Sequence, residues 1–228
     1  MSSKLVDFPV KLVHPSAILV SGPTGCGKTQ LVSKLITESM FTHTFNKLYW
    51  LFAEWQPTYS KLQILRPDIQ FLKWESDAIN SLYDKLTPST NNLVVIDDLM
   101  TQAGESQVLK RLFTEGSHHR NLSIIYIVQN LFDKGKSHRT ASLNAQYIFL
   151  FKNSRDQGQV EVLAKQMYSR HSAILSDAFS LATSIPYGYL LIDLRQETPN
   201  DYRLRSNILP GQVVEYYEPL YTNKHSSF

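Results

Sequence analysis

AILVSGPTGCGKTQLVSKLI, residues 17–36, joins an apolar run to a glycine-rich turn and then to a helical pattern. The run Ala17–Val20 has the length and composition of a buried strand, and a helix is expected from Thr29 to Glu38. The turn GPTGCGKT (Gly22–Thr29) fits the pattern Gly-x4-Gly-Lys-Ser/Thr of a phosphate-binding loop. Its glycines let successive backbone N–H groups face one anion, and the helix N-terminus adds a positive dipole there. The strand–turn–helix context therefore predicts a P-loop nucleotide site.

The residues of this turn have separate roles in binding ATP. Lys28 is expected to reach the β- and γ-phosphates, and the Thr29 hydroxyl is expected to ligate Mg²⁺. Cys26 is interpreted as a spacer, with a redox role as the alternative. The predicted nucleotide-binding residues are Gly22, Pro23, Thr24, Gly25, Cys26, Gly27, Lys28 and Thr29.

The composition is that of a globular protein. The chain has 228 residues, of which 43% are hydrophobic and 19% charged, which suits one large α/β domain and argues against dominant disorder. A single cysteine excludes an intramolecular disulfide and a cysteine-rich zinc site, and it favours a reducing compartment. The apolar runs are of strand length, so we expect a soluble intracellular protein without a membrane partner. The net charge of +3 permits an acidic polymer as partner without requiring one.

Short β-branched and aromatic runs alternate with helical patterns along the chain, which predicts an α/β fold with a mostly parallel central sheet and helices on both faces. The predicted strands are residues 17–20, 47–52, 69–74, 92–98, 122–128, 147–152 and 187–194. The predicted helices are residues 29–38, 76–85, 107–115, 156–168 and 171–181. Leu122–Val128 is the most apolar run and should be central. We expect an ATPase domain over residues 1–195 and a C-terminal arm, residues 196–228, that packs on the domain or on a neighbouring subunit.

Two acids end the apolar strand VVIDD (Val94–Asp98), about 70 residues beyond Lys28. Asp97 is predicted to hold the Mg²⁺ shell, and Asp98 to polarise the attacking water. The alternative for Asp98 is a cap at the strand end, because Asp is shorter than the Glu that many ATPases have there. The acid pair favours hydrolysis over nucleotide binding alone.

A polar amide, Gln129, ends the next strand of the chain. Because ligands of parallel sheets bind at the carboxyl ends of the strands, Gln129 is expected beside the γ-phosphate, where it could sense the phosphate or orient water. The alternative is an amide that faces solvent.

The order of GPTGCGKT, LVVIDD and SHHRNLSIIYIVQN resembles the FtsK–HerA superfamily of additional-strand, RecA-like P-loop ATPases. Within it, the sequence is similar to the genome-packaging ATPases of large DNA viruses, of the poxvirus type and of Polinton (Maverick) and adintovirus-like relatives, from about Ser16 to Asp193. The resemblance implies a homo-oligomeric ring that uses ATP and Mg²⁺ to pump double-stranded DNA into a capsid. Capsid or portal proteins would be further partners, in the host nucleus or at a cytoplasmic assembly site.

In this superfamily an arginine just before the glutamine strand completes the site of the neighbouring subunit, and Arg120 occupies that place. Arg139 and Arg155 are rival candidates, and a solvated surface role is the alternative for Arg120. With Lys28, Asp98 and Gln129, Arg120 completes the predicted catalytic set.

The segment DKGKSHR, residues 133–139, is interpreted as a basic loop. Its Lys134, Lys136 and Arg139 could contact DNA phosphates from a ring pore, without reading sequence. A solvated charged loop is the alternative. Two other functions stay open: a nucleotide-dependent assembly switch that does not pump DNA, and a monomeric kinase-type P-loop NTPase.

Overall fold

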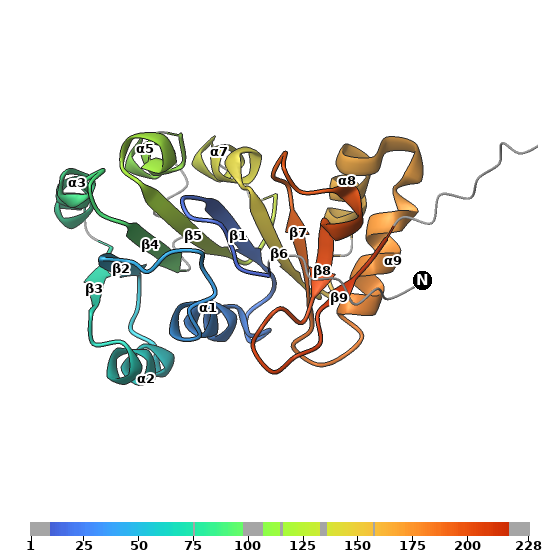
Figure 1. Cartoon of the computed structure of the whole chain (residues 1–228), viewed down its shortest axis with the longest axis horizontal. Coiled ribbons are helices and arrows are strands. Elements are labelled where there is room, and N and C mark those ends of the chain that lie inside the picture. The colour runs from blue at the N-terminus through green and yellow to red at the C-terminus, as the bar shows by residue number, and fades with distance from the viewer. Residues whose placement is uncertain are drawn as a thin grey trace, which may run out of the picture.

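A computed structural model describes residues 10–74, 76–97, 107–114, 116–132, 136–156 and 158–218. In these residues nine strands form one sheet in the order β3-β2-β4-β5-β1-β6-β7-β8-β9 (Figure 1). The strands are β1 (Ala17–Ser21), β2 (Lys47–Phe52), β3 (Ile69–Lys73), β4 (Asn92–Asp97), β5 (Leu122–Val128), β6 (Tyr147–Phe151), β7 (Tyr189–Asp193), β8 (Leu204–Ser206) and β9 (Glu215–Tyr216). Neighbours from β3 to β6 are parallel, and those from β6 to β9 are antiparallel. The predicted mostly parallel sheet is confirmed.

Helices cover both faces of the sheet, as predicted. They are α1 (Lys28–Thr37), α2 (Pro57–Leu65), α3 (Ser76–Lys85), α5 (Gln107–Thr114), α6 (Gly116–His119), α7 (Lys136–Asn144), α8 (Gly158–Tyr168) and α9 (Ala173–Ala182), with short 3-10 turns at Ser169–His171 and Asn200–Tyr202. Figure 1 shows α1 and α2 on one face and α3, α5 and α7 on the other. Among the described residues, no helix combines the length and the apolar character that crossing a membrane requires.

Strand β5 lies between the P-loop strand β1 and the acid-bearing strand β4. All seven of its residues are buried, because helices cover both faces of this part of the sheet. Alternate side chains enter opposite cores: Tyr126 packs in one, and Ile125 and Ile127 pack in the other. The run that the sequence marks as most apolar is therefore central, and it is the additional strand of an additional-strand P-loop fold.

The interpretation of residues 133–139 as a basic loop is wrong for its second half. Helix α7 begins at Lys136 and includes Arg139. His138 of this helix is 5% exposed, and its Nδ1 lies 2.7 Å from the Tyr126 hydroxyl of β5. This tertiary contact favours a helix over a loop in a polar sequence. Lys134 lies outside the described residues, as does the side chain of Lys136.

After β7 the chain extends the same sheet through β8 and β9. Asp193 of β7 is fully buried and pairs with two arginines, Arg195 and Arg205. The Arg195 Nη2 lies 2.8 Å from Asp193 Oδ2, and Arg205 is 1% exposed. This buried ion pair fixes β8 against β7. The division of the chain at residue 195 stays a prediction.

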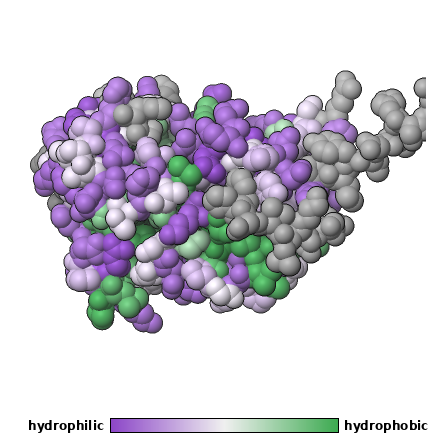
Figure 2. Space-filling view, in the orientation of Figure 1, coloured by the Kyte–Doolittle hydropathy of each residue, from purple (hydrophilic) through white to green (hydrophobic). Residues whose placement is uncertain are grey.

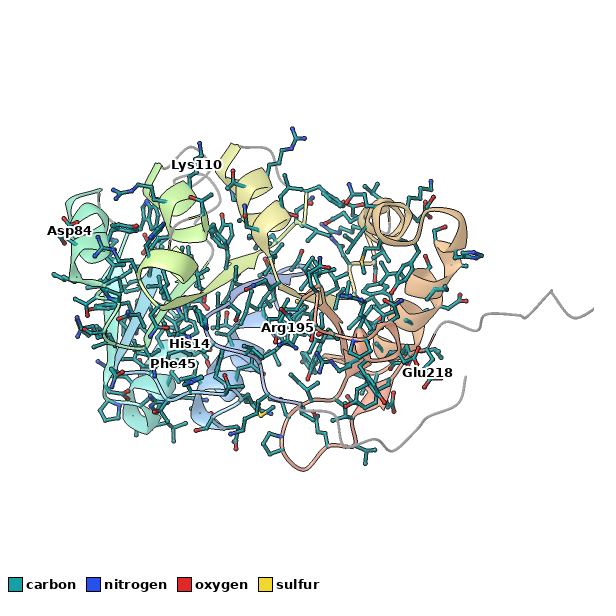
Figure 3. All side chains as sticks on the ribbon, turned by 45° about the horizontal axis from the view of Figure 1, so that its top comes forward. His14, Phe45, Asp84, Lys110, Arg195 and Glu218 are labelled. Atoms are coloured by element: carbon teal, nitrogen blue, oxygen red, sulfur yellow. The ribbon has the colours of Figure 1, made fainter. Side chains whose placement is uncertain are left out.

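At the amino edge of the sheet, His14 is held just before β1. It is 4% exposed, its Nδ1 lies 2.7 Å from Ser123 Oγ, and its ring meets Phe45 edge to face at 5.1 Å between centroids (Figure 3). Burial lowers the pKa of His14 below its ordinary value.

Candidate nucleotide-binding site

The P-loop leaves the carboxyl end of β1 and enters α1. The Gly22 amide donates to the Val128 carbonyl at 3.3 Å, which ties the start of the loop to the end of β5. Gly25 and Gly27 have φ values of +79° and +103°, in the left-handed region that glycine adopts at little cost. Helix α1 then begins at Lys28, so its N-terminus faces the concave side of the loop.

Lys28 lies inside the loop. It is 9% exposed, and its Nζ donates to the Gly22 carbonyl at 2.6 Å and to the Pro23 carbonyl at 2.9 Å. An ammonium held by two carbonyl oxygens can exchange them for the more strongly charged oxygens of phosphate. The geometry agrees with the predicted contact between Lys28 and the phosphates, which stays a prediction.

Cys26 is half-buried in the loop. Burial raises the pKa of the Cys26 thiol, which keeps the sulfur protonated and a poor nucleophile. This favours the spacer interpretation over a redox role.

Two oxygen ligands meet where α1 approaches the end of β4. The Thr29 hydroxyl donates to Asp97 Oδ2 at 3.2 Å, and Asp97 is 2% exposed. A hydroxyl and a carboxylate are the hard oxygen ligands that Mg²⁺ takes in proteins, so the residues present fit that ion. Thr29 and Asp97 are the two residues that the sequence predicted for the metal.

Tyr59 is a site residue that the sequence did not reveal. It lies on α2, is fully buried, and its hydroxyl donates to the same Asp97 Oδ2 at 2.8 Å. Its ring lies in an aromatic cluster with Trp50, Phe52 and Phe71, at centroid distances of 5.5, 5.7 and 5.6 Å. The available sequence signal was Gln56-Pro57, which indicates the start of a helix, since proline is favoured at the first helical position.

Gln129 follows β5 and is half-buried at the carboxyl edge of the sheet. It lines one pocket together with Ser21, Gly22 and Asn153. The structure thus brings Gln129 beside the P-loop, rather than out into solvent. Asp98 lies outside the described residues, so its role as a base stays a prediction.

The three arginine candidates lie in different places. Arg120 precedes β5 at the amino edge, about 23 Å from the P-loop edge if β5 rises roughly 3.3 Å for each residue. Its Nη1 donates to the Leu86 carbonyl at 3.0 Å, and its guanidinium lies 4.8 Å from the Tyr83 ring centroid. Arg139 is exposed on α7, and Arg155 is exposed after β6. Arg120 is thus too far to serve its own P-loop, and service to a neighbouring subunit stays a prediction.

Comparisons with known proteins place this site in a family. Residues 2–117, just over half of the chain, match the family model of the NB-ARC domain. A probable disease resistance protein of Arabidopsis thaliana is 31% identical over 103 residues, which are 42% of this chain, and the match spans only 13% of that protein.

Solved structures match over most of the chain. The genome packaging NTPase B204 of Sulfolobus turreted icosahedral virus 2, in complex with ATP-gammaS, is 12% identical with a TM-score of 0.53, over 90% of this chain and 98% of that one. Its complex with sulfate is 13% identical with a TM-score of 0.54, over 90% and 96% of the two chains. At this identity the likeness shows the fold, an α/β P-loop fold with a mostly parallel sheet.

Proposed function

The chain belongs to the NB-ARC domain family and is a nucleotide-binding P-loop ATPase, and from that premise we propose that it is an ATP-driven motor that moves double-stranded DNA. The position of β5 carries the proposal. It lies between the P-loop strand and the acid-bearing strand, with Arg120 before its amino end and Gln129 after its carboxyl end. A rigid strand can couple a neighbouring subunit at one edge of the sheet to the nucleotide at the other.

The chemistry assigns one task to each residue. Lys28 and the loop N–H groups neutralise charge on the phosphates, and Gln129 senses the γ-phosphate or orients water. Thr29 and Asp97 would hold Mg²⁺, which when bound supplies further positive charge to the phosphate oxygens. Asp98 is proposed to accept the proton of the attacking water.

The work of the motor is proposed to be viral genome packaging by a homo-oligomeric ring. The proposal is supported by the likeness to a genome packaging NTPase over 90% of this chain. Arg120 would complete the site of the next subunit. Lys134, Lys136 and Arg139 would contact the DNA backbone, which is a mode of binding that does not depend on sequence.

A triplex-displacement assay with the full chain tests translocation. The protein with ATP should strip a third strand from double-stranded DNA, and Lys28→Ala should not. Lys61→Ala is the matched control, because Lys61 is an exposed lysine on α2 outside the P-loop. A protein that hydrolyses ATP but never displaces the strand would refute the motor.

A second candidate is a nucleotide-dependent assembly switch that does not pump DNA. The NB-ARC match to residues 2–117 favours it, because that match covers the P-loop and β4 but stops before β5. A switch should change its mass in solution with the nucleotide bound, and its ATP turnover should not respond to double-stranded DNA.

A further inference from the structure

We infer that the purine base of the bound nucleotide occupies a groove beside Tyr187, and that the Tyr187 ring is its stacking surface. The inference rests on the proposed nucleotide site and assigns a part of the ligand that the P-loop does not hold.

Tyr187 is 70% exposed, and its backbone has a φ of +61°. A bulky residue in this left-handed region is strained, and such strain is found where the surrounding structure or a function requires it. The ring lies against the P-loop, since a methyl group placed on Gly27 would be 3.4 Å from the Tyr187 Cδ1. The tight turn before β7, with the Gly188 amide donating to the Ile185 carbonyl at 3.1 Å, holds the residue in place.

Two adjoining pockets meet at this ring, and both are lined by Gly27, Gln30 and Tyr187. The phosphate pocket, of about 230 Å³, also contains Lys28 and Thr29. The base pocket, of about 160 Å³, shares Tyr187 with the phosphate pocket but is lined by neither Lys28 nor Thr29. A nucleoside triphosphate matches these two pockets, because its ribose joins a charged triphosphate to a flat aromatic base. A ligand with its phosphates on Lys28 would therefore extend its base past Tyr187.

The lining of the base pocket suits a purine. Ile185, Pro186 and Leu209 offer apolar surface, and Asn207 and Gln212 offer amides. The Gln212 Oε1 accepts from the Leu209 amide at 3.2 Å, so the Gln212 nitrogen is the end that can donate to a ring nitrogen of the base. Figure 2 shows hydrophobic surface beside α1, over the segments around β8 and β9. An aromatic stacking surface with a few amides is typical of a nucleobase site.

The test compares two ligands, ATP and inorganic tripolyphosphate, each titrated with MgCl₂ into the full chain by calorimetry. Tyr187→Ala should weaken ATP binding about tenfold, because it removes the ring on which the base stacks. It should leave tripolyphosphate binding unchanged. Tyr187→Phe is the matched control and should bind ATP within about twofold of the unmodified protein, because it keeps the ring.

The outcomes separate the inference from the nucleotide site itself. Lys28→Ala should weaken the binding of both ligands. An unmodified chain that binds neither ligand would refute the nucleotide site and the inference together. Tyr187→Ala that binds ATP normally, or that loses both ligands equally, would overturn the inference alone. Tyr187→Gly guards against misfolding, since glycine accepts the positive φ. It should lose affinity for ATP while its melting temperature stays the same or rises.

Discussion

Tyr59→Phe removes one oxygen atom, the tyrosine hydroxyl, which donates to the Asp97 carboxylate as the Thr29 hydroxyl also does. The hydroxyl donates to Asp97 Oδ2 at 2.8 Å between two buried residues, and the phenylalanine ring keeps the aromatic contacts with Trp50, Phe52 and Phe71. A hydrogen bond to a charged group contributes about 1.5–3 kcal/mol. Thr29 still donates to the same oxygen, so we expect the lower end, a loss of about 1.5 kcal/mol in the free energy of unfolding. In a chain of this size that lowers the melting temperature by roughly 3–6 °C.

The same change should also weaken the binding of Mg²⁺ at the site. A side chain that orients a metal-binding carboxylate typically contributes about 10–100-fold to metal affinity or activity. We therefore expect the Mg²⁺ concentration for half-maximal ATP hydrolysis to rise at least about tenfold. The assays are urea unfolding and ATP turnover over a range of MgCl₂ concentrations.

Tyr49→Phe is the matched control for this prediction. Tyr49 is a buried tyrosine of β2 that packs in the core on the opposite face from Tyr59. Its change should leave the Mg²⁺ dependence of turnover unaltered. If Tyr59→Phe loses stability with no change in Mg²⁺ dependence, the hydroxyl is structural only and the reasoning about Asp97 fails.

Three further predictions concern the rest of the molecule. Arg120→Ala should abolish turnover but retain ATP binding, and mixing it with Asp98→Asn should restore activity; mixed rings without any recovery would contradict an arginine acting in trans. Asp193→Ala should cost about 3–5 kcal/mol in urea unfolding, because it leaves two arginine side chains without their buried carboxylate, whereas exposed Asp201→Ala should cost little. Finally, the folded pKa of His14 is lowered, so the unfolded chain binds more protons as the pH falls below about 6.5. Stability should therefore drop between pH 7.5 and 5.5, and His14→Gln should reduce that drop; an equal drop in both proteins would show that other groups cause it.

The parts of the fold that the sequence predicted are those with strong local signals. Leu122–Val128 is apolar at every position except Ser123 because helices cover both faces of β5, and the P-loop has a specific pattern of glycine, lysine and threonine. Helix α7 was missed because its sequence is polar and it depends on the distant contact between His138 and Tyr126. Strands β8 and β9 have three and two residues, too few for a period to be seen.

The residues of the site also differ in whether the sequence could predict them. Thr29 and Asp97 could be paired from the sequence, because β1 and β4 run parallel and end at the same edge of the sheet. Tyr59 and Tyr187 could not be predicted as site residues, since each reaches the site through tertiary structure. Tyr59 depends on how α2 packs, and Tyr187 depends on a backbone conformation that tyrosine rarely adopts.

The most direct measurement of the motor proposal is the rate of ATP hydrolysis by the full chain with and without double-stranded DNA. Mass in solution is determined in the same samples, at low and at high salt. The proposal predicts an oligomer whose turnover rises with DNA, and a stimulation that falls steeply with salt because phosphate contacts dominate. Equal turnover with and without DNA at every salt concentration would contradict it, whether the chain is a monomer or a ring.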